Sequence, residues 1–245
     1  MTIEIKNLTK TFKNNNDNEE KTVLDNLNLT FEDKKFICLV GHSGCGKTTL
    51  LRLIGGLDNP SSGEILEDGK LVNGPSTNRG FIFQQYSLFP WMTVFDNVMF
   101  PLRVKGDVEE KSKQRVEAYL KGVGLESAKD LYPYQLSGGM KQRVALIRTL
   151  INHPKTVLMD EPFSALDMLT KHDLQDKLLT AVSKYNTIIF VTHDISEATY
   201  LADEIVVMGR SGGEIKDIIN VDVPRPRKRN DPELLKIQDE ISEYL

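Results

Sequence analysis

A glycine-rich stretch from Gly41 to Thr49 carries the residue types that bind phosphate. Glycines admit positive φ angles, so successive backbone N–H groups can turn inward toward phosphate oxygens. Lys47 can reach the β- and γ-phosphates of a nucleotide, and the Thr48 hydroxyl can ligate Mg²⁺. The stretch lies between an apolar run and a helical leucine pattern, which is the context that a phosphate-binding loop requires. We therefore predict a nucleotide site made by Gly41, His42, Ser43, Gly44, Cys45, Gly46, Lys47, Thr48 and Thr49.

Two acids, Asp160 and Glu161, follow a second apolar run. An aspartate at the end of a strand can hold Mg²⁺ through water, and the neighbouring glutamate can orient or deprotonate an attacking water. Alone, such a pair is often a helix-capping turn, but a phosphate loop upstream at this distance favours the metal-site interpretation. We predict that Thr48 and Asp160 bind the metal and that Glu161 is catalytic.

The sequence Leu-Ser-Gly-Gly from residue 136 opens a long helical pattern. Ser137 is a natural N-cap, and a simple cap would explain it. Alternatively, Ser137, Gly138 and Gly139 form a second anion site at the start of that helix. Since the first loop already holds the phosphates of one nucleotide, a second site makes most sense if it serves a different copy of the chain.

Two residues near the phosphate loop each have two possible roles. Phe12 could stack on a nucleotide base or cap the core, and the periodicity favours neither. Cys45 lies at a helix start beside Lys47, where a thiol becomes reactive, so we predict that maleimide modifies it and that bound nucleotide protects it; the alternative is a buried, inert thiol. The other cysteine, Cys38, fits a small core residue, and two cysteines are too few for a disulfide framework.

Composition bounds the class of protein. The chain has 245 residues, of which 40% are hydrophobic, enough for one large α/β domain with a buried core. Its net charge of −4 argues against nucleic-acid binding. The basic cluster at residues 225–229 is predicted to be a solvated connector rather than a lipid patch or nuclear signal. Without an apolar run of ~20 residues or a signal-peptide pattern, we expect a soluble, cytosolic chain.

Periodicity divides the chain into a sheet region and a helical region. Alternation over residues 2–32 predicts antiparallel strands joined by a mobile polar loop at 14–21, and Asp68-Gly69 predicts a hairpin. Apolar runs predict further strands at 36–40, 79–84, 156–161, 187–193, 204–208 and 214–219. Gln84 ends one of them, at the edge where α/β sheets bind ligands. Helical periodicity dominates 85–153 and predicts an inserted lobe, followed later by a last helix at 232–245.

The motifs and their order resemble the nucleotide-binding domain of an ATP-binding cassette (ABC) transporter. They are the phosphate loop (Walker A), Leu-Ser-Gly-Gly, Asp-Glu-Pro at 160–162 (Walker B) and Thr-His-Asp at 192–194, and the match covers essentially the whole chain. The implied fold is α/β, with a P-loop NTPase (RecA-like) core, an antiparallel β subdomain and an inserted α-helical subdomain. It makes residues 1–245 a single domain, with the core and β subdomain at 1–84 and 154–245 and the helical subdomain at 85–153.

The resemblance also implies roles for individual residues. Gln84 matches the glutamine that touches Mg²⁺ and the attacking water, and His193 matches the switch histidine that contacts the γ-phosphate. Ser137 to Gly139 match the signature that closes on the ATP of the opposing subunit, and residues 164–167 match the D-loop. Phe12 falls at the position of an adenine-stacking aromatic. The implied catalytic residues are Lys47, Gln84, Glu161 and His193.

Finer details resemble ATPases of the nitrate/sulfonate/taurine importer group. They are Leu-Phe-Pro-Trp at 88–91, Asp-Glu-Pro-Phe at 160–163 and the tail Val-Pro-Arg-Pro-Arg at 223–227. The resemblance implies an ATPase at the cytoplasmic face of a bacterial membrane, using ATP and Mg²⁺ to energise uptake of a small, anionic solute. Its partners would be a transmembrane permease, a second copy in a head-to-tail dimer and, indirectly, an extracytoplasmic solute-binding protein. The alternative is a non-transport ABC ATPase, such as an iron–sulphur assembly scaffold or a division factor.

Overall fold

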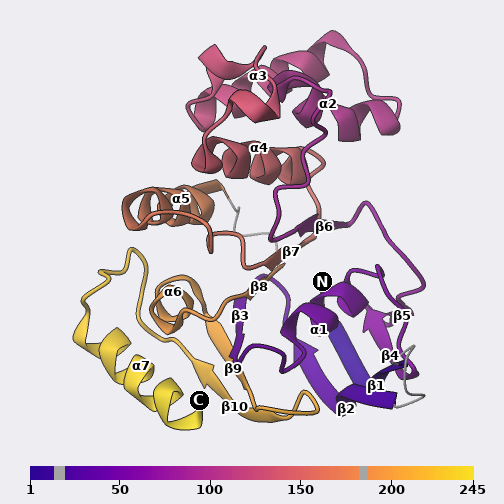
Figure 1. Cartoon of the computed structure of the whole chain (residues 1–245), viewed down its shortest axis with the longest axis vertical. Helices are drawn as coiled ribbons and strands as arrows, with labels where there is room; N and C mark the ends of the chain where they lie inside the picture. The colour runs from indigo at the N-terminus through magenta and orange to yellow at the C-terminus, as the bar shows by residue number, and fades with distance from the viewer. Residues whose placement is uncertain (14–19, 182–186) are drawn as a thin grey trace.

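The computed structural model describes residues 1–13, 20–181 and 187–245 (Figure 1). Its strands are β1 (Ile3–Lys13), β2 (Glu20–Phe31), β3 (Phe36–Gly41), β4 (Ser62–Glu67), β5 (Lys70–Leu71), β6 (Arg79–Ile82), β7 (Thr156–Asp160), β8 (Thr187–Val191), β9 (Glu204–Met208) and β10 (Ile215–Asn220). Its α-helices are α1 (Lys47–Ile54), α2 (Val94–Val104), α3 (Glu110–Gly122), α4 (Gly138–Leu150), α5 (Met168–Ala181), α6 (Ile195–Leu201) and α7 (Pro232–Tyr244). Two 3₁₀ turns, η1 (Glu126–Ala128) and η2 (Pro133–Gln135), precede α4.

A six-stranded sheet forms the core, in the order β10-β9-β3-β8-β7-β6. Strands β9, β3, β8, β7 and β6 pair in parallel, and β10 adds an antiparallel edge. All residues of β3, β7, β8 and β9 are buried, as expected for parallel strands covered on both faces. The carboxyl ends of β3, β7 and β8 therefore bring the phosphate loop, Asp160 and His193 to one edge of the sheet.

The predicted strands are confirmed, with shifted ends. Strand β6 ends at Ile82, so Phe83 and Gln84 lie beyond it rather than inside it. Strand β8 ends at Val191, which leaves Thr192 and His193 in the following loop. The Thr192 N–H still donates to the Leu39 carbonyl of β3 at 3.2 Å, so the chain leaves the sheet directly before His193.

A second, four-stranded antiparallel sheet has the order β2-β1-β4-β5 and forms the predicted β subdomain. The Asp68-Gly69 hairpin is confirmed, with both residues at positive φ as a two-residue turn requires. Residues 14–19 of the polar loop, and the expectation that it is mobile, lie outside the described residues. Lys21 was predicted in that loop, but it belongs to β2 and pairs with Phe12 across the sheet.

Helices α2, α3 and α4 gather at one end of the molecule, and α4 lies between the other two helices and the core sheet (Figure 1). Leu146 and Leu150 of α4 pack in the hydrophobic core of that sheet. The three helices share a hydrophobic cluster of their own, in which Val98, Leu120 and Ile147 are buried. This cluster corresponds to the predicted helical subdomain, whereas its boundaries at residues 85 and 153 stay a prediction. Within the described ranges, none of the helices combines the length and the apolar character that crossing a membrane requires.

The basic cluster at 225–229 is not a solvated connector, and that prediction was wrong. Arg227 is buried and donates hydrogen bonds to backbone carbonyls at the end of α6 and around the end of β10. Arg229 stacks 3.7 Å over the ring of Tyr200, and Arg225 pairs with Asp203. The guanidinium has several N–H donors in one plane and can satisfy a cluster of carbonyls, so it can be buried. The prediction considered only the charge of these residues.

Candidate nucleotide-binding and hydrolysis site

The phosphate loop joins β3 to α1 and opens onto a cavity of about 400 Å³. Gly44 and Gly46 have φ angles of 82° and 107°, in the left-handed region where a side chain would strain the turn. Gly46 is also the N-cap of α1, so the positive end of the helix faces the loop. The cavity is lined by Lys21, Val23, Ser43, Gly44, Gly46, Lys47, Thr48, Thr49 and Glu161.

Lys47 is buried, with 6% of its surface exposed. Its Nζ donates to the carbonyls of Gly41 at 2.7 Å and His42 at 2.9 Å, which hold the ammonium against the loop. Among the described residues, no carboxylate lies within ion-pair distance of this ammonium. A buried cation without an acidic partner is costly unless an anion completes the site. The loop therefore fits a phosphate group.

Thr48 and Asp160 lie side by side although they are far apart in the sequence. The Thr48 hydroxyl donates to Asp160 Oδ1 at 2.9 Å. Burial raises the pKa of the Asp160 carboxyl, and the Thr48 hydrogen bond opposes that shift. Hydroxyl and carboxylate oxygens are the hard donors that Mg²⁺ prefers. The donor set beside the phosphate loop thus fits Mg²⁺.

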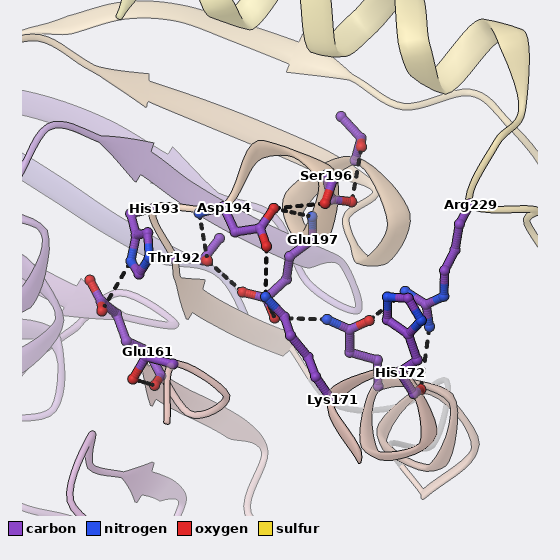
Figure 2. Close-up of polar contacts among 12 residues, drawn as sticks. Glu161, Lys171, His172, Thr192, His193, Asp194, Ser196, Glu197 and Arg229 are labelled. Carbon is purple, nitrogen blue, oxygen red and sulfur yellow. Dashed lines mark hydrogen bonds and ion pairs between the residues drawn. The ribbon is translucent and has the colours of Figure 1, made fainter. Parts of the chain in front are cut away.

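Glu161 and His193 face one another across the same edge of the sheet (Figure 2). His193 Nδ1 lies 3.2 Å from Glu161 Oε2, and the Glu161 side chain is 23% exposed and lines the cavity. Glu161 has a φ of 43°, unusual for a residue with a side chain, and its N–H donates to the Val191 carbonyl. Strained backbone of this kind concentrates at functional sites. The arrangement suits a base that acts on water at the cavity.

The remaining predicted residues are not brought to this cavity. Gln84 is exposed in the segment after β6, and Phe12 is 42% exposed, with Lys10 Nζ 4.9 Å from its ring centre. Ser137 caps α4, accepting from the Met140 N–H at 3.3 Å, and it lies outside the cavity lining together with Gly138 and Gly139. The cap is confirmed, while nucleotide contacts of these five residues stay predictions.

Three details of the phosphate loop and its cavity were not evident from the sequence. Lys21 and Val23 of β2 line the cavity, and only the pairing of β1 with β2 places them there. Cys45 is buried, with 1% exposed, and its Sγ lies 3.7 Å from Lys47 Nζ, which favours the packed thiol over the reactive one. His42 Nε2 accepts a hydrogen bond from Arg210 Nε at 3.3 Å, and the sequence motif does not predict this contact.

Comparison with known proteins assigns the family. A family model described as ABC transporter matches residues 24–164, more than half of the chain. The nitrate import ATP-binding protein NrtD of Synechocystis sp. is 45% identical over 232 residues, covering 91% of this chain and 87% of that protein. The aliphatic sulfonates import ATP-binding protein SsuB of Bacillus cereus is 41% identical over 242 residues, covering 98% of this chain and 94% of that protein.

A solved structure shares the fold. The dimeric, post-hydrolysis structure of the ATP-binding cassette MJ0796 with ADP and Pi has a TM-score of 0.79 and 34% identity to this chain. The match covers 91% of this chain and 100% of that chain. Together with the phosphate loop and the Glu161–His193 contact, these likenesses fix the assignment. The chain belongs to the ABC transporter family and is the ATP-binding, ATP-hydrolysing subunit of a transporter.

Proposed function

We propose that this ATPase energises uptake of a small anion, of the nitrate, sulfonate or taurine kind, through a separate transmembrane permease. The observation that carries the proposal is its identity of 41–45% to nitrate and aliphatic sulfonate import proteins over nearly the whole chain. An extracytoplasmic binding protein would deliver the solute, and the chain would work at the cytoplasmic face of the membrane.

Each residue of the site takes a separate chemical role. Lys47 and the N–H groups of the phosphate loop bind the β- and γ-phosphates of ATP. Thr48, Asp160 and Gln84 would hold Mg²⁺, which when bound neutralises charge on the phosphate oxygens. Glu161 orients and deprotonates the attacking water, and His193 contacts the γ-phosphate.

A second copy of the chain would complete each site. The lining of the cavity comes from β2, the phosphate loop, α1 and Glu161. Ser137 to Gly139 lie elsewhere, at the start of α4, where the helix N-terminus offers N–H groups to an anion. In a head-to-tail dimer these groups close on the ATP held by the partner. The dimeric state of the related cassette supports this arrangement.

The loop after Gln84 is the proposed docking surface for the permease. Trp91 is 70% exposed, yet the loop beneath it is anchored, because Asn97 is buried and donates to the carbonyls of Phe89, Met92 and Thr93. The Phe89 ring packs 4.6 Å from Phe100 and 5.6 Å from Trp91. A large apolar side chain displayed on an anchored loop is typical of a contact surface, and tryptophan is enriched among interface hot spots.

The test compares Trp91→Ala with Leu235→Ala, another exposed apolar side chain, on α7. The chain would be reconstituted in proteoliposomes with its permease and binding protein, and uptake of labelled nitrate and taurine would be measured. Trp91→Ala should abolish solute-stimulated hydrolysis and uptake, at a hot-spot cost of ~2 kcal/mol or more, while basal ATPase stays within a few-fold. Leu235→Ala should transport normally.

Three results would count against the proposal. If neither nitrate nor taurine is taken up or stimulates the ATPase, the proposed solute class is refuted. An ATP hydrolysis rate that no permease changes would favour the non-transport alternative. A loss of thermal stability in the isolated Trp91→Ala chain, of the ~3–5 kcal/mol size expected for a core tryptophan, would refute docking at this residue.

A further inference from the structure

A buried ion-pair network lies directly behind His193, outside the lining of the nucleotide cavity (Figure 2). Its centre is Glu197 of α6, whose side chain is 4% exposed. Glu197 Oε1 accepts from Gln175 Nε2 at 2.8 Å and lies 3.4 Å from Lys171 Nζ. Glu197 Oε2 accepts the hydroxyl hydrogen bond of Thr192. Glu197 therefore connects α5 to the residue that precedes His193.

The residue that follows His193 is bound to the same cation. Asp194 Oδ2 accepts from Lys171 Nζ at 2.7 Å, and the Asp194 N–H donates to Thr192 Oγ1 at 3.0 Å. Both neighbours of His193 are thus fixed to one Lys171–Glu197 pair. The His193 side chain is 58% exposed and reaches away from the network toward Glu161.

The network also closes a ring that includes Glu161. From Glu161 the chain runs through residues 162–167 into α5, where the Lys171 N–H donates to the Asp167 carbonyl at 2.9 Å. From Lys171 the ion pair crosses to Glu197, and Thr192 returns to His193, which meets Glu161. The Lys171–Glu197 pair is therefore connected to Glu161 through the chain and to His193 through Thr192.

Packing of α5 on α6 does not by itself account for the network. The Tyr200 hydroxyl donates to Asp176 Oδ1 at 2.7 Å, which anchors the same two helices without touching residues 192–194. A buried carboxylate costs free energy that an apolar side chain would not. Burial raises the pKa of Glu197, and its contacts with Thr192, Lys171 and Gln175 oppose that shift. The contacts that make this carboxylate tolerable are those that hold the His193 segment.

We propose that Thr192, Glu197 and Lys171 are positioning residues that fix His193 against Glu161. The proposal rests on the roles proposed above for Glu161 and His193. Since none of the three lines the cavity, their loss should lower turnover and leave ATP binding in place. A misplacement of reacting groups by about 1 Å can cost on the order of 10²-fold in rate.

The test is a matched pair at one position, measured on the full chain. Thr192→Val keeps the shape but removes the hydroxyl, and Thr192→Ser keeps the hydroxyl. Thr192→Val should lower kcat roughly 10- to 100-fold with the KM for ATP within about twofold, and Thr192→Ser should stay near wild type. Tyr200→Phe, which breaks the other α5–α6 hydrogen bond, should also stay near wild type. Where Thr192→Val does not fold, Glu197→Gln takes its place.

His193→Ala, measured in parallel, separates the role of His193 from the role of the residues that position it. If His193→Ala loses turnover but Thr192→Val does not, the positioning proposal is overturned and the role of His193 stands. Equal losses in Thr192→Val and Tyr200→Phe would also overturn it, because general helix packing would then explain both. Wild-type turnover in His193→Ala would remove the proposed role of His193 itself, and the positioning proposal with it.

Discussion

Replacing Arg227 by methionine should destabilise the fold although no catalytic group is touched. Arg227 is 8% exposed, and its guanidinium donates to five carbonyls, those of Val221, Val223, Thr199, Tyr200 and Ala202. Burial lowers the pKa of Arg227 to about 10, which reflects the cost of enclosing a cation. Methionine keeps an apolar stem of similar length and leaves the carbonyls without these donors.

The magnitude follows from those contacts. At ~1 kcal/mol for each buried carbonyl that loses its donor, less ~1–2 kcal/mol recovered by no longer burying a cation, Arg227→Met should cost ~3–4 kcal/mol. For a chain of this size that corresponds to a Tm lower by roughly 6–16 °C. Arg227→Lys, with its donors on a single nitrogen, should lose about half as much.

Thermal melts and urea titrations of the purified chain measure this loss, and Lys228→Met is the control. Lys228 is exposed next to Arg227, so its replacement should change stability by no more than ~0.5 kcal/mol. If Arg227→Met melts within 2 °C (about the effect of ~1 kcal/mol) of wild type, the carbonyls are satisfied in some other way and the reasoning fails.

Two further predictions concern Asp194 and Cys45. Burial alone would raise the pKa of Asp194, but hydrogen bonds from Lys171, Ser196 and the Glu197 N–H lower it from 3.8 to about 2. The ionised Asp194 carboxylate therefore adds to the free energy of unfolding above pH ~4, and this stabilisation is lost as the pH falls toward ~2. The difference in urea midpoint between wild type and Asp194→Asn should narrow over that range. The full shift would be worth ~2 kcal/mol, discounted to ~1 because the side chain is 34% exposed. Cys45, buried beside Lys47, should resist maleimide in the native chain and react after unfolding, as mass spectrometry can follow; rapid native labelling that MgATP prevents would show the opposite.

The sequence could predict what depends on local pattern. Buried strands with polar ends, the N-cap at Ser137 and the Asp68-Gly69 turn each follow from the spacing of a few neighbouring residues. The placement of Asp160 and His193 at the carboxyl ends of their strands follows from the same local pattern, because each comes at the end of an apolar run.

What the sequence could not predict depends on pairing between distant segments. Lys21 reaches the cavity through the register of β1 with β2, and a period of two residues does not specify register. From the sequence, Arg227 is expected to be exposed to solvent, because its carbonyl partners on α6 are distant in the chain. From the sequence, Glu197 is expected to be an exposed acid on a helix, because its partners come from α5 and from the loop after β8. The order of β10, β9 and β3 is a tertiary property of the same kind.

The central claim, that Glu161 acts on water beside a preformed phosphate loop, is tested most directly by Glu161→Gln. The amide nearly preserves the shape of the side chain but cannot take a proton, and losing a general base typically costs ~10²–10⁴ in rate. The measurement is steady-state ATPase beside ATP binding and size-exclusion chromatography with ATP, with Lys47→Ala as the variant that should lose nucleotide affinity. The Glu161→Gln chain should bind ATP, fail to turn over and elute as a dimer. Turnover at the wild-type rate in Glu161→Gln would contradict the central claim.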